Sequence, residues 1–358
     1  MSSLDNYVII TSKRFLEKIN NYLEFKRNFY NIPKRNIITV EEIEKSNYYK
    51  MIKDEDLIDT VIEEYKKVID TTNLNPIQIH GKSKFMYKMA EAIKAKIIDL
   101  SSNIKISYLL IIGDSGIVPP YCYYWKGADS SGYETTITYF SDQIYGDLDF
   151  EDSHIEVAVF RIAVVSNFTF TEVLDKILGY EKYVHDYINN ENKNSDKFNW
   201  IKRICLFPDT TNGNDFLNAI NKIKTYLENI EDISERLMIS QEDSQENTIE
   251  KFNRGSVFWI YFGRGDHSGW NAVNGINNTM IKNLENNKML PIVISNGSST
   301  CSVQYERRKI FGQQLLNKKN GGSVFTIGPS YIMDLDISTK VVMQFLKEIF
   351  ENKRITNF

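Results

Sequence analysis

The sequence has few cysteines, no long apolar run and little net charge. Cys122, Cys205 and Cys301 are far apart and odd in number, so we expect no disulfide framework, and no Cys/His spacing indicates zinc. No apolar run approaches the ~18 residues of a membrane span, and no basic segment followed by an apolar one marks a signal peptide. The net charge of −4 lacks the basic footprint of a nucleic-acid-binding protein. We therefore expect a soluble protein without nucleic-acid partners, located in the cytoplasm, or secreted if export segments have been trimmed from this sequence.

The composition is that of an ordinary globular protein. Hydrophobic residues make up 42% of the 358 residues and charged residues 25%, and the 13% of aromatic residues favours packed sheets over disorder. A chain of this length can bury one large core or form two subdomains of ~150–180 residues each.

Short apolar segments alternate with segments of helical periodicity along the whole chain. Apolar runs that do not alternate with polar residues indicate strands of a parallel sheet covered on both faces. The expected strands are 7–10, 36–40, 106–114, 154–165, 200–209, 255–263, 290–297 and 321–328. The expected helices are 14–29, 55–70, 84–100, 170–188, 214–230, 278–286, 308–318 and 339–352. We predict an α/β protein with an N-terminal subdomain over 1–167 and a C-terminal one over 168–358.

Small and polar residues follow four of the predicted strands. Ligands of parallel α/β folds bind at the carboxyl ends of the strands, and small residues there let the backbone approach a ligand and expose N–H groups. These strand ends therefore predict a functional site. The residues are Asp114; Arg264 between two glycines, with His267 three positions later; Ser298 and Cys301 in "SNGSSTCS"; and Gly328 with Ser330.

Several of these motifs together resemble the gingipain family of cysteine peptidases. The runs "YLLIIGDSGIVPPY" and "FSDQIYGDLDFED", with the strand and the "KILGYE" helix after them, are similar to that family's first subdomain. The segments "VFWIYFGRGDHSGW", "PIVISNGSSTCS" and "FGQQLLNKKNGGSVFTIGPS" follow in the family's order, and the resemblance covers roughly residues 7–350. It implies a caspase-like α/β fold with mostly parallel sheets, a catalytic His at the end of one strand and a nucleophilic Cys at the end of the next.

The two catalytic positions of the family are both changed in this sequence. Matching the family's Gly-His-Gly motif through Trp270 puts Arg264 in the place of the histidine, and matching the next strand puts Ser298 in the place of the cysteine. Gly265 and Ser298 would then carry the oxyanion N–H groups. Arginine has no acceptor atom and stays charged, and a serine hydroxyl without a base is a poor nucleophile. The catalytic dyad is therefore replaced, although an arginine can bind a carboxylate.

These replacements leave three hypotheses for the function. The first is a proteolytically inactive scaffold that binds a peptide or protein partner. The second is an active cysteine endopeptidase that cleaves after basic residues, using Cys301 with His267, or one whose native catalytic residues have been substituted in this sequence. Those two residues lie three positions after the replaced ones, about 10 Å of extended chain, so both loops would have to shift. The third is a structural module of a larger assembly.

The resemblance also implies roles for several acidic residues. Asp142 matches the acidic residue associated with the pocket for a basic side chain; a loop or capping role is the alternative. Glu134 is our guess for the residue that would orient the family's histidine. No cofactor is expected for catalysis. A dense acidic run can hold a structural Ca²⁺, as in several family members, or form a solvated loop: Asp147, Asp149, Glu151 and Asp152.

Overall fold

The chain forms two compact units in its computed structural model. The structure describes residues 7–26, 36–69, 72–128, 134–149, 155–189, 196–211, 213–231, 233, 235–240, 242–303 and 309–351. One unit comprises Met1–Thr171 with Val303–Arg308, and the other Glu172–Ser302 with Lys309–Phe358. The first crossing between the units lies a few residues beyond the boundary that the sequence suggested.

The first unit is built on a four-stranded parallel sheet. Its strand order is β2-β1-β3-β6, with every neighbouring pair parallel. The strands are β1 (Tyr7–Thr11), β2 (Ile37–Thr39), β3 (Tyr108–Ile112) and β6 (Ala158–Ile162). They are short and mostly apolar because both of their faces are covered.

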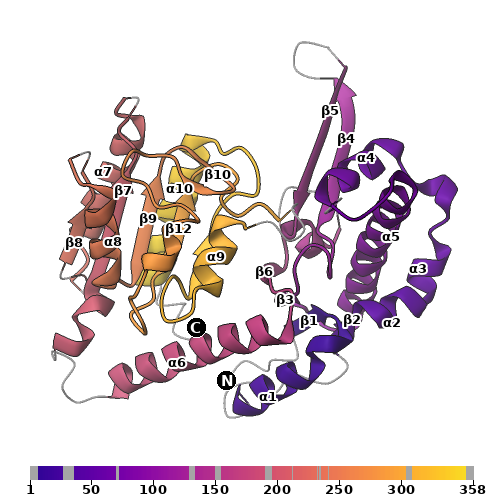
Figure 1. Ribbon diagram of the computed structural model, residues 1–358, viewed down its shortest axis with the longest axis horizontal. Helices are drawn as coiled ribbons and strands as arrows, with labels where there is room; N and C mark the ends of the chain where they lie inside the picture. The colour runs from indigo at the N-terminus through magenta and orange to yellow at the C-terminus, as the bar shows by residue number, and fades with distance from the viewer. Residues whose placement is uncertain are drawn as a thin grey trace. The chain divides into compact units, whose positions relative to one another are not determined.

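Helices cover this sheet, and their starts are set by local sequence. The helices are α1 (Leu16–Lys26), α2 (Val40–Lys45), α3 (Asn47–Met51), α4 (Asp59–Val68) and α5 (Pro76–Ser101). Thr39 and Glu42 form a capping box at α2, and Asn75 and Gln78 form another at α5, whose first residue is Pro76. Helices α4 and α5 pack together and contribute Tyr65 and other buried side chains to the core of this unit (Figure 1).

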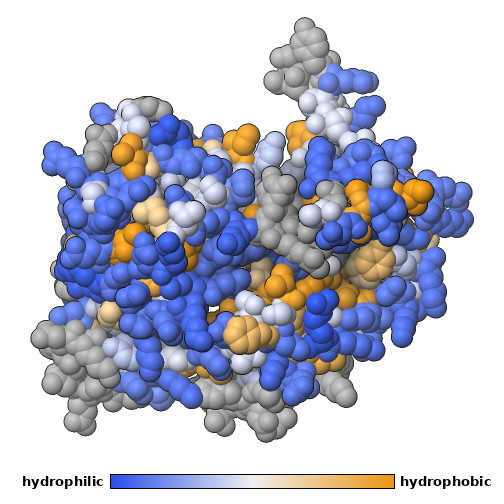
Figure 2. Space-filling view, viewed as in Figure 1, coloured by the Kyte–Doolittle hydropathy of each residue, from blue (hydrophilic) through white to orange (hydrophobic). Residues whose placement is uncertain are grey.

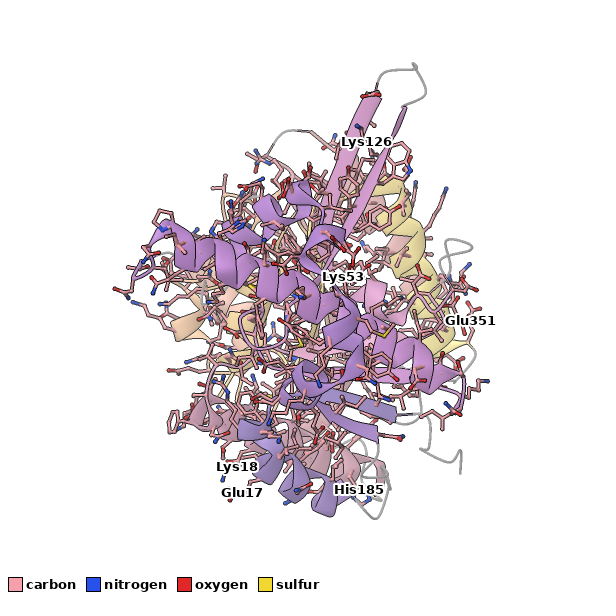
Figure 3. The ribbon with its side chains drawn as sticks, turned by 90° about the vertical axis from the view of Figure 1, so that its right-hand side faces the viewer. Glu17, Lys18, Lys53, Lys126, His185 and Glu351 are labelled. Atoms are coloured by element: carbon pink, nitrogen blue, oxygen red, sulfur yellow. The ribbon has the colours of Figure 1, made fainter. Side chains whose placement is uncertain are left out.

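A long antiparallel hairpin, which the sequence did not reveal, belongs to the first unit. It joins β4 (Tyr121–Ala128) to β5 (Glu134–Ser141) and extends beyond α4 and α5 (Figure 1). Figure 3 shows Lys126 on this projecting ribbon. Three buried side chains bind successive carbonyls at its base, from Val118 to Pro120. Arg161 Nη1 donates to the first at 2.9 Å, Tyr145 Oη to the second at 2.6 Å and Tyr65 Oη to the third at 2.8 Å.

The second unit is built on a five-stranded sheet in which all neighbouring strands are parallel. The order is β13-β12-β9-β7-β8. The strands are β7 (Arg203–Pro208), β8 (Glu235–Met238), β9 (Phe258–Phe262), β12 (Ile292–Asn296) and β13 (Phe325–Ile327). The register aligns Pro208, Phe262 and Asn296 across the three central strands, so their carboxyl ends lie at one edge of the sheet.

Two apolar clusters cover the two faces of this sheet. One face packs against α7 (Asp215–Leu227) and α10 (Leu335–Phe350). The other packs against α8 (Gln245–Asn253), α9 (Phe311–Asn317) and Trp270 of a small hairpin, β10 (Gly265–Asp266) with β11 (Gly269–Trp270). The long helix α6 (Asn167–Asn189) contains the point where the chain passes from one unit to the other. The predicted α/β class with mostly parallel sheets is confirmed.

One predicted helix was wrong. Residues 278–286 form a turn and a single short 3-10 helix, Ile281–Asn283. The side chain of Asn277 accepts hydrogen bonds from the N–H and the hydroxyl of Thr279, at 3.0 and 2.7 Å, and so holds the chain in a turn. The apolar spacing that suggested a helix comes from Ile281 and Leu284, whose side chains are buried although the segment is a turn.

The described part of the chain has no helix long and apolar enough to cross a membrane. Figure 2 shows a mostly hydrophilic face with hydrophobic residues gathered at a few places. Among the described residues of the second unit, the exposed large hydrophobic side chains are Val273, Tyr331, Ile332, Ile337 and Val341.

Candidate functional site

Arg264 and Ser298 flank a close contact between two glycines. β9 and β12 are neighbours, and the loops that follow them carry Gly265 and Gly297. A Cβ on Gly265 would lie only 3.1 Å from the Cα of Gly297 and 2.9 Å from the Cγ2 of Thr300. The two loops therefore pack backbone against backbone, and only glycine permits this approach. The fold brings Arg264 and Ser298, the two positions that the sequence matched to the family's dyad, to one place at the carboxyl edge of the sheet.

Arg264 is held by a buried carboxylate that the sequence analysis missed. Asp209 follows β7, and its side chain is only 1% exposed, whereas that of Arg264 is 42% exposed. Asp209 Oδ2 accepts hydrogen bonds from Arg264 Nε at 2.9 Å and from its backbone N–H at 3.3 Å. Asp209 Oδ1 accepts from the N–H and the hydroxyl of Thr211, at 3.0 and 2.6 Å. The signal was available, because "CLFPD" places an acid at the end of the strand beside β9.

The backbone of Arg264 is fixed as firmly as its side chain. Its carbonyl accepts from Tyr261 Oη at 2.6 Å and from the N–H of Asn271 at 2.9 Å. Gly263 leaves the space for this arrangement, since a Cβ there would lie 2.3 Å from Tyr261 Oη and 2.4 Å from the Cβ of Asp209. The hydrogen bonds of Arg264 therefore connect the carboxyl ends of β7 and β9.

The charge state of this pair does not suit a proton relay. Burial raises the pKa of Asp209, but hydrogen bonds from Arg264 and Thr211 outweigh it, and the pKa lies below its usual value. The hydrogen bond to Asp209 raises the pKa of Arg264 still further above neutrality. A permanently charged guanidinium has no lone pair with which to accept a proton from a nucleophile.

A buried hydrogen-bond relay fixes the loop that carries Ser298. Trp270 Nε1 donates to Ser295 Oγ at 2.8 Å, and Ser295 Oγ donates to Thr300 Oγ1 at 2.9 Å. Thr300 Oγ1 in turn donates to the carbonyl of Gly297 at 2.9 Å. Ser298 itself is half-buried. The relay couples the β10–β11 hairpin to the turn after β12 and thereby sets the spacing of the two loops.

Cys301 and His267, the alternative dyad, lie on segments that meet the start of α9. The carbonyl of His267 accepts from the N–H of Phe311 at 2.9 Å, and the N–H of Gly312 donates to Thr300 at 3.0 Å. A Cβ on Gly312 would lie 2.6 Å from Cys301 Sγ. Burial raises the pKa of the Cys301 thiol to about 12, so it is protonated at neutral pH. This environment does not favour a nucleophilic thiolate, and the displaced dyad stays a prediction.

Asp142 lies in the first unit as the partner of a buried arginine. Its Oδ1 and Oδ2 accept from Nη2 and Nε of Arg161, both at 2.6 Å, and both side chains are nearly inaccessible to solvent. Arg161 Nη1 also donates to the carbonyl of Gly113 at 2.8 Å. A role for Asp142 in binding a basic ligand stays a prediction and would require the ligand to compete with Arg161.

The acidic residues proposed for Ca²⁺ are only partly described. The carboxylates of Asp147, Asp149 and Glu156 have ligand atoms within 4.8 Å of one another. Glu151 and Asp152 lie outside the described residues. Glu156 Oε2 accepts from the N–H of Leu148 at 2.7 Å, so this carboxylate also orders the loop. Hard oxygen donors of this kind fit Ca²⁺, and the site stays a prediction. Glu134, the guessed orienting acid, is exposed at the start of β5.

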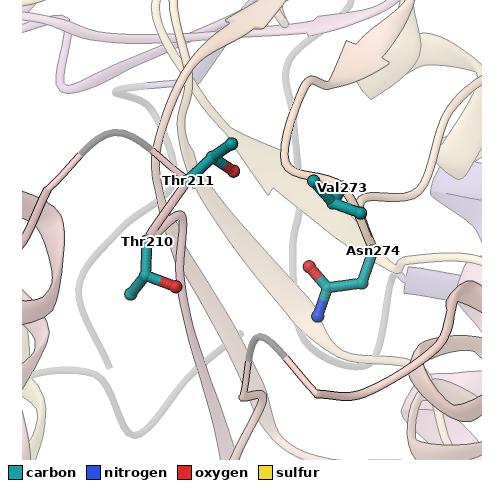
Figure 4. A pocket seen from close by; sticks show the side chains of 4 residues that line it. All are labelled: Thr210, Thr211, Val273 and Asn274. Atoms are coloured by element: carbon teal, nitrogen blue, oxygen red, sulfur yellow. The ribbon is translucent and has the colours of Figure 1, made fainter.

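A surface pocket lies beside the Asp209–Arg264 pair. It has a volume of about 240 Å³ and is lined by Thr210, Thr211, Val273 and Asn274 (Figure 4). Thr211 binds Asp209 directly, so the pocket and the ion pair share one wall. Its polar groups are neutral hydroxyls and an amide.

The order of the strands and the two loops at the ends of β9 and β12 define a gingipain-like cysteine-peptidase fold. The model of peptidase family C25 matches residues 3–357, and the chain belongs to this family. Among solved structures, the chain is similar to the Arg-specific cysteine proteinase gingipain R (RGPB), with a TM-score of 0.68 and 15% identity over 98% of this chain and 70% of that one. It is also similar to the complex of the Porphyromonas gingivalis RgpB pro- and mature domains, with a TM-score of 0.67 and 16% identity over 97% and 69%. A third structure, a protease, has a TM-score of 0.63 and 16% identity over 92% and 60%. No curated protein matches the chain.

Proposed function

We propose that this chain is a pseudopeptidase, which binds a peptide or protein partner on a peptidase fold without cleaving it. The Arg264–Asp209 pair carries this proposal. A buried carboxylate binds both the backbone and the side chain of the arginine, which supports an arginine that is part of the site's structure. Ser298 stands at the cysteine position, and this arginine cannot accept a proton from its hydroxyl.

A second observation supports the absence of cleavage. Peptide hydrolysis by this family's chemistry needs a thiolate, and Cys301 is the cysteine nearest to the site in sequence. Its thiol is buried against Gly312 and Gly328, where its pKa is about 12. A thiol with this pKa is less than one part in ~10⁴ ionised at pH 7, because each pH unit changes the ionised fraction tenfold.

The second part of the proposal is that a partner binds at the carboxyl edge of the sheet. A relative with a solved structure, RgpB, forms a complex between its pro- and mature domains, which supports a protein or peptide as the kind of partner. The pocket beside Asp209 offers a depression of about 240 Å³ at the same edge. Absence of nucleic-acid partners and location in the cytoplasm stay predictions.

Cleavage and binding can be tested on the purified chain. We would incubate it with a library of basic, acidic and apolar peptides and follow every peptide by intact mass, while measuring binding to the same library by fluorescence anisotropy. The proposal expects binding of some peptides and no new cleavage products. Turnover that iodoacetamide abolishes would contradict it.

One observation favours the alternative of an active peptidase. The consecutive residues Phe311 and Gly312 bind the carbonyls of His267 and Thr300, so the chain segments of the displaced dyad meet at the start of α9. The matched pair of variants Cys301→Ala and Ser298→Ala separates the alternatives. Cleavage that is lost in Cys301→Ala and retained in Ser298→Ala would establish Cys301 as the nucleophile.

A further inference from the structure

A groove on the surface of the second unit lies between the helices α7 and α10. It has a volume of about 370 Å³, within the range of about 300–1,000 Å³ that is usual for ligand sites. The two helices cover the same face of the five-stranded sheet, and their buried side chains share one apolar cluster beneath the groove. This α7–α10 groove has no lining residue in common with the pocket beside Asp209. It is therefore a second candidate binding site on the same unit.

One face of α10 forms most of the groove, and Lys222 faces it from α7. Residues three or four positions apart share a face of a helix, and the α10 residues that line the groove follow this spacing from Asp336 to Lys347. Eleven residues of helix rise about 16 Å. An extended peptide rises about 3.3 Å per residue, so about five residues span this length. The dimensions therefore fit a short stretch of chain better than a single ion.

Three lysines line the groove against a single carboxylate. Lys222 and Lys340 are exposed, Lys347 is half-buried, and Asp336 is the acidic lining residue. None of the three lysines forms an ion pair with a residue of the described part of the chain. By contrast, Lys224, two positions along α7 from Lys222, pairs with a nearby glutamate at 4.0 Å. The groove therefore presents an excess of positive charge that is accessible to a partner.

Apolar surface lies in the groove and beside it. Met343 lines the groove and packs against the apolar cluster beneath. Ile337 and Val341 each follow a groove residue by one position, and their side chains are 64% and 60% exposed. Aliphatic side chains suit the apolar side chains of a peptide, whereas bases of single-stranded nucleic acid stack on aromatic rings. A flat membrane surface would leave the groove empty. These features together favour a peptide as the occupant.

We propose that the α7–α10 groove binds a short acidic segment of a protein partner in an extended conformation. Carboxylates of this segment pair with Lys222, Lys340 and Lys347, because an ammonium group only donates hydrogen bonds and a carboxylate only accepts them. The residue of the segment that lies beside Asp336 is neutral or basic, since like charges repel. This binding goes beyond the proposed function. It uses a different surface of the second unit and does not depend on what the carboxyl edge of the sheet binds.

Fluorescence anisotropy with three matched labelled peptides tests this assignment. The peptides are identical except for three central residues, which are all Glu, all Gln or all Lys. We expect the full chain to bind the Glu peptide most tightly, and less tightly as salt rises from about 50 to about 300 mM, because exposed charges are screened. The triple variant Lys222→Gln, Lys340→Gln, Lys347→Gln should weaken binding of the Glu peptide about tenfold, which is the expected sum of three exposed ion pairs.

A second triple variant controls for the loss of charge. Lys224→Gln, Lys288→Gln and Lys319→Gln remove three lysines of the same unit that do not line the groove, and binding of the Glu peptide should stay within about twofold of the native protein. Both triple variants should melt close to the native protein, because they change surface residues. Asp336→Asn removes the carboxylate of the groove and should tighten binding of the Glu peptide about twofold. A folding defect cannot produce such a gain.

The outcomes separate this assignment from the proposed function. Equal binding of the Glu and Gln peptides, equal weakening by the two triple variants, or no binding at all overturns the groove as an acidic site. Binding of the Glu peptide that the groove variant does not change overturns it too, and leaves peptide binding at the carboxyl edge standing. Oligo(dT) or phosphatidylserine vesicles serve as competing probes. If the groove lysines bind either of them more tightly than the Glu peptide, the occupant is a nucleic acid or a membrane and the assignment is wrong.

Discussion

Replacing Asp209 with asparagine should destabilise the second unit by about 3 kcal/mol. The change keeps the acceptor that binds Thr211, but it turns a donor toward the N–H and Nε of Arg264, which both bind Oδ2 in the native protein. The N–H of Arg264 then lacks its partner, which costs about 1–3 kcal/mol. The guanidinium is 42% exposed and can turn to water, so its share is discounted to about 0–1 kcal/mol. The contact between the new amide donor and the N–H groups of Arg264 adds a further destabilisation to these two contributions.

The assay is chemical and thermal unfolding followed by tryptophan fluorescence, to which Trp200, Trp259 and Trp270 contribute from buried positions in the second unit. Domains of about 150–250 residues lose about 2–4 °C per kcal/mol, so the transition should fall by roughly 6–12 °C. The exposed Asp336 provides the control, because Asp336→Asn should stay within about 0.5 kcal/mol of the native protein.

The difference between the native protein and Asp209→Asn should depend on pH in one direction. The folded pKa of Asp209 is below its unfolded value of about 3.9, so its contribution is fully present above that value and is lost as the pH falls through the folded pKa. The gap in stability should be constant from pH 5 to 8 and shrink below pH 4. A variant within about 0.5 kcal/mol of the native protein at pH 7 would refute the reasoning.

Three further predictions concern the same unit. Cys301 should resist iodoacetamide at pH 7.5 in the folded protein and react only on unfolding, because burial raises its pKa to about 12; rapid labelling seen by intact mass would contradict this. Lys176 donates to four backbone carbonyls at and after the end of α9, and Lys176→Met should lower stability by about 1–3 kcal/mol in urea unfolding; an unchanged midpoint would show that these carbonyls find water instead. Gly265→Ala should destabilise by about 1–3 kcal/mol through its contact with Gly297. Gly179→Ala, where nothing lies within 4 Å, should be neutral or stabilising; equal effects of the two alanines would count against a tight loop contact.

The sequence predicted those parts of the fold that depend on local apolar patterns. Strands such as 258–262 and 292–296 are buried on both faces, and their unbroken apolar runs are readable without any knowledge of their neighbours. The β4–β5 hairpin was missed because its polar and aromatic residues alternate only weakly with burial, and its position depends on anchors as distant in sequence as Tyr65 and Arg161.

The sequence predicted the loops of the candidate site, but it did not predict the side-chain contacts that hold them. The glycines around Arg264 and before Ser298 marked both loops, since close backbone approach needs them. Asp209 lies 55 residues before its partner, and its pairing with Arg264 follows from β7 and β9 being neighbours, which one sequence does not state.

The way in which the chain is divided between the two units limits how the protein can be cut into separate fragments. The chain leaves the second unit after Ser302, contributes Val303–Arg308 to the first, and returns at Lys309. Val303 packs against the core of the first unit. No single cut in the gene can therefore yield both halves whole, and a C-terminal fragment would carry a stray hydrophobic residue only five positions after Ser298. Expression of the second half alone calls for a short designed bridge between Ser302 and Lys309.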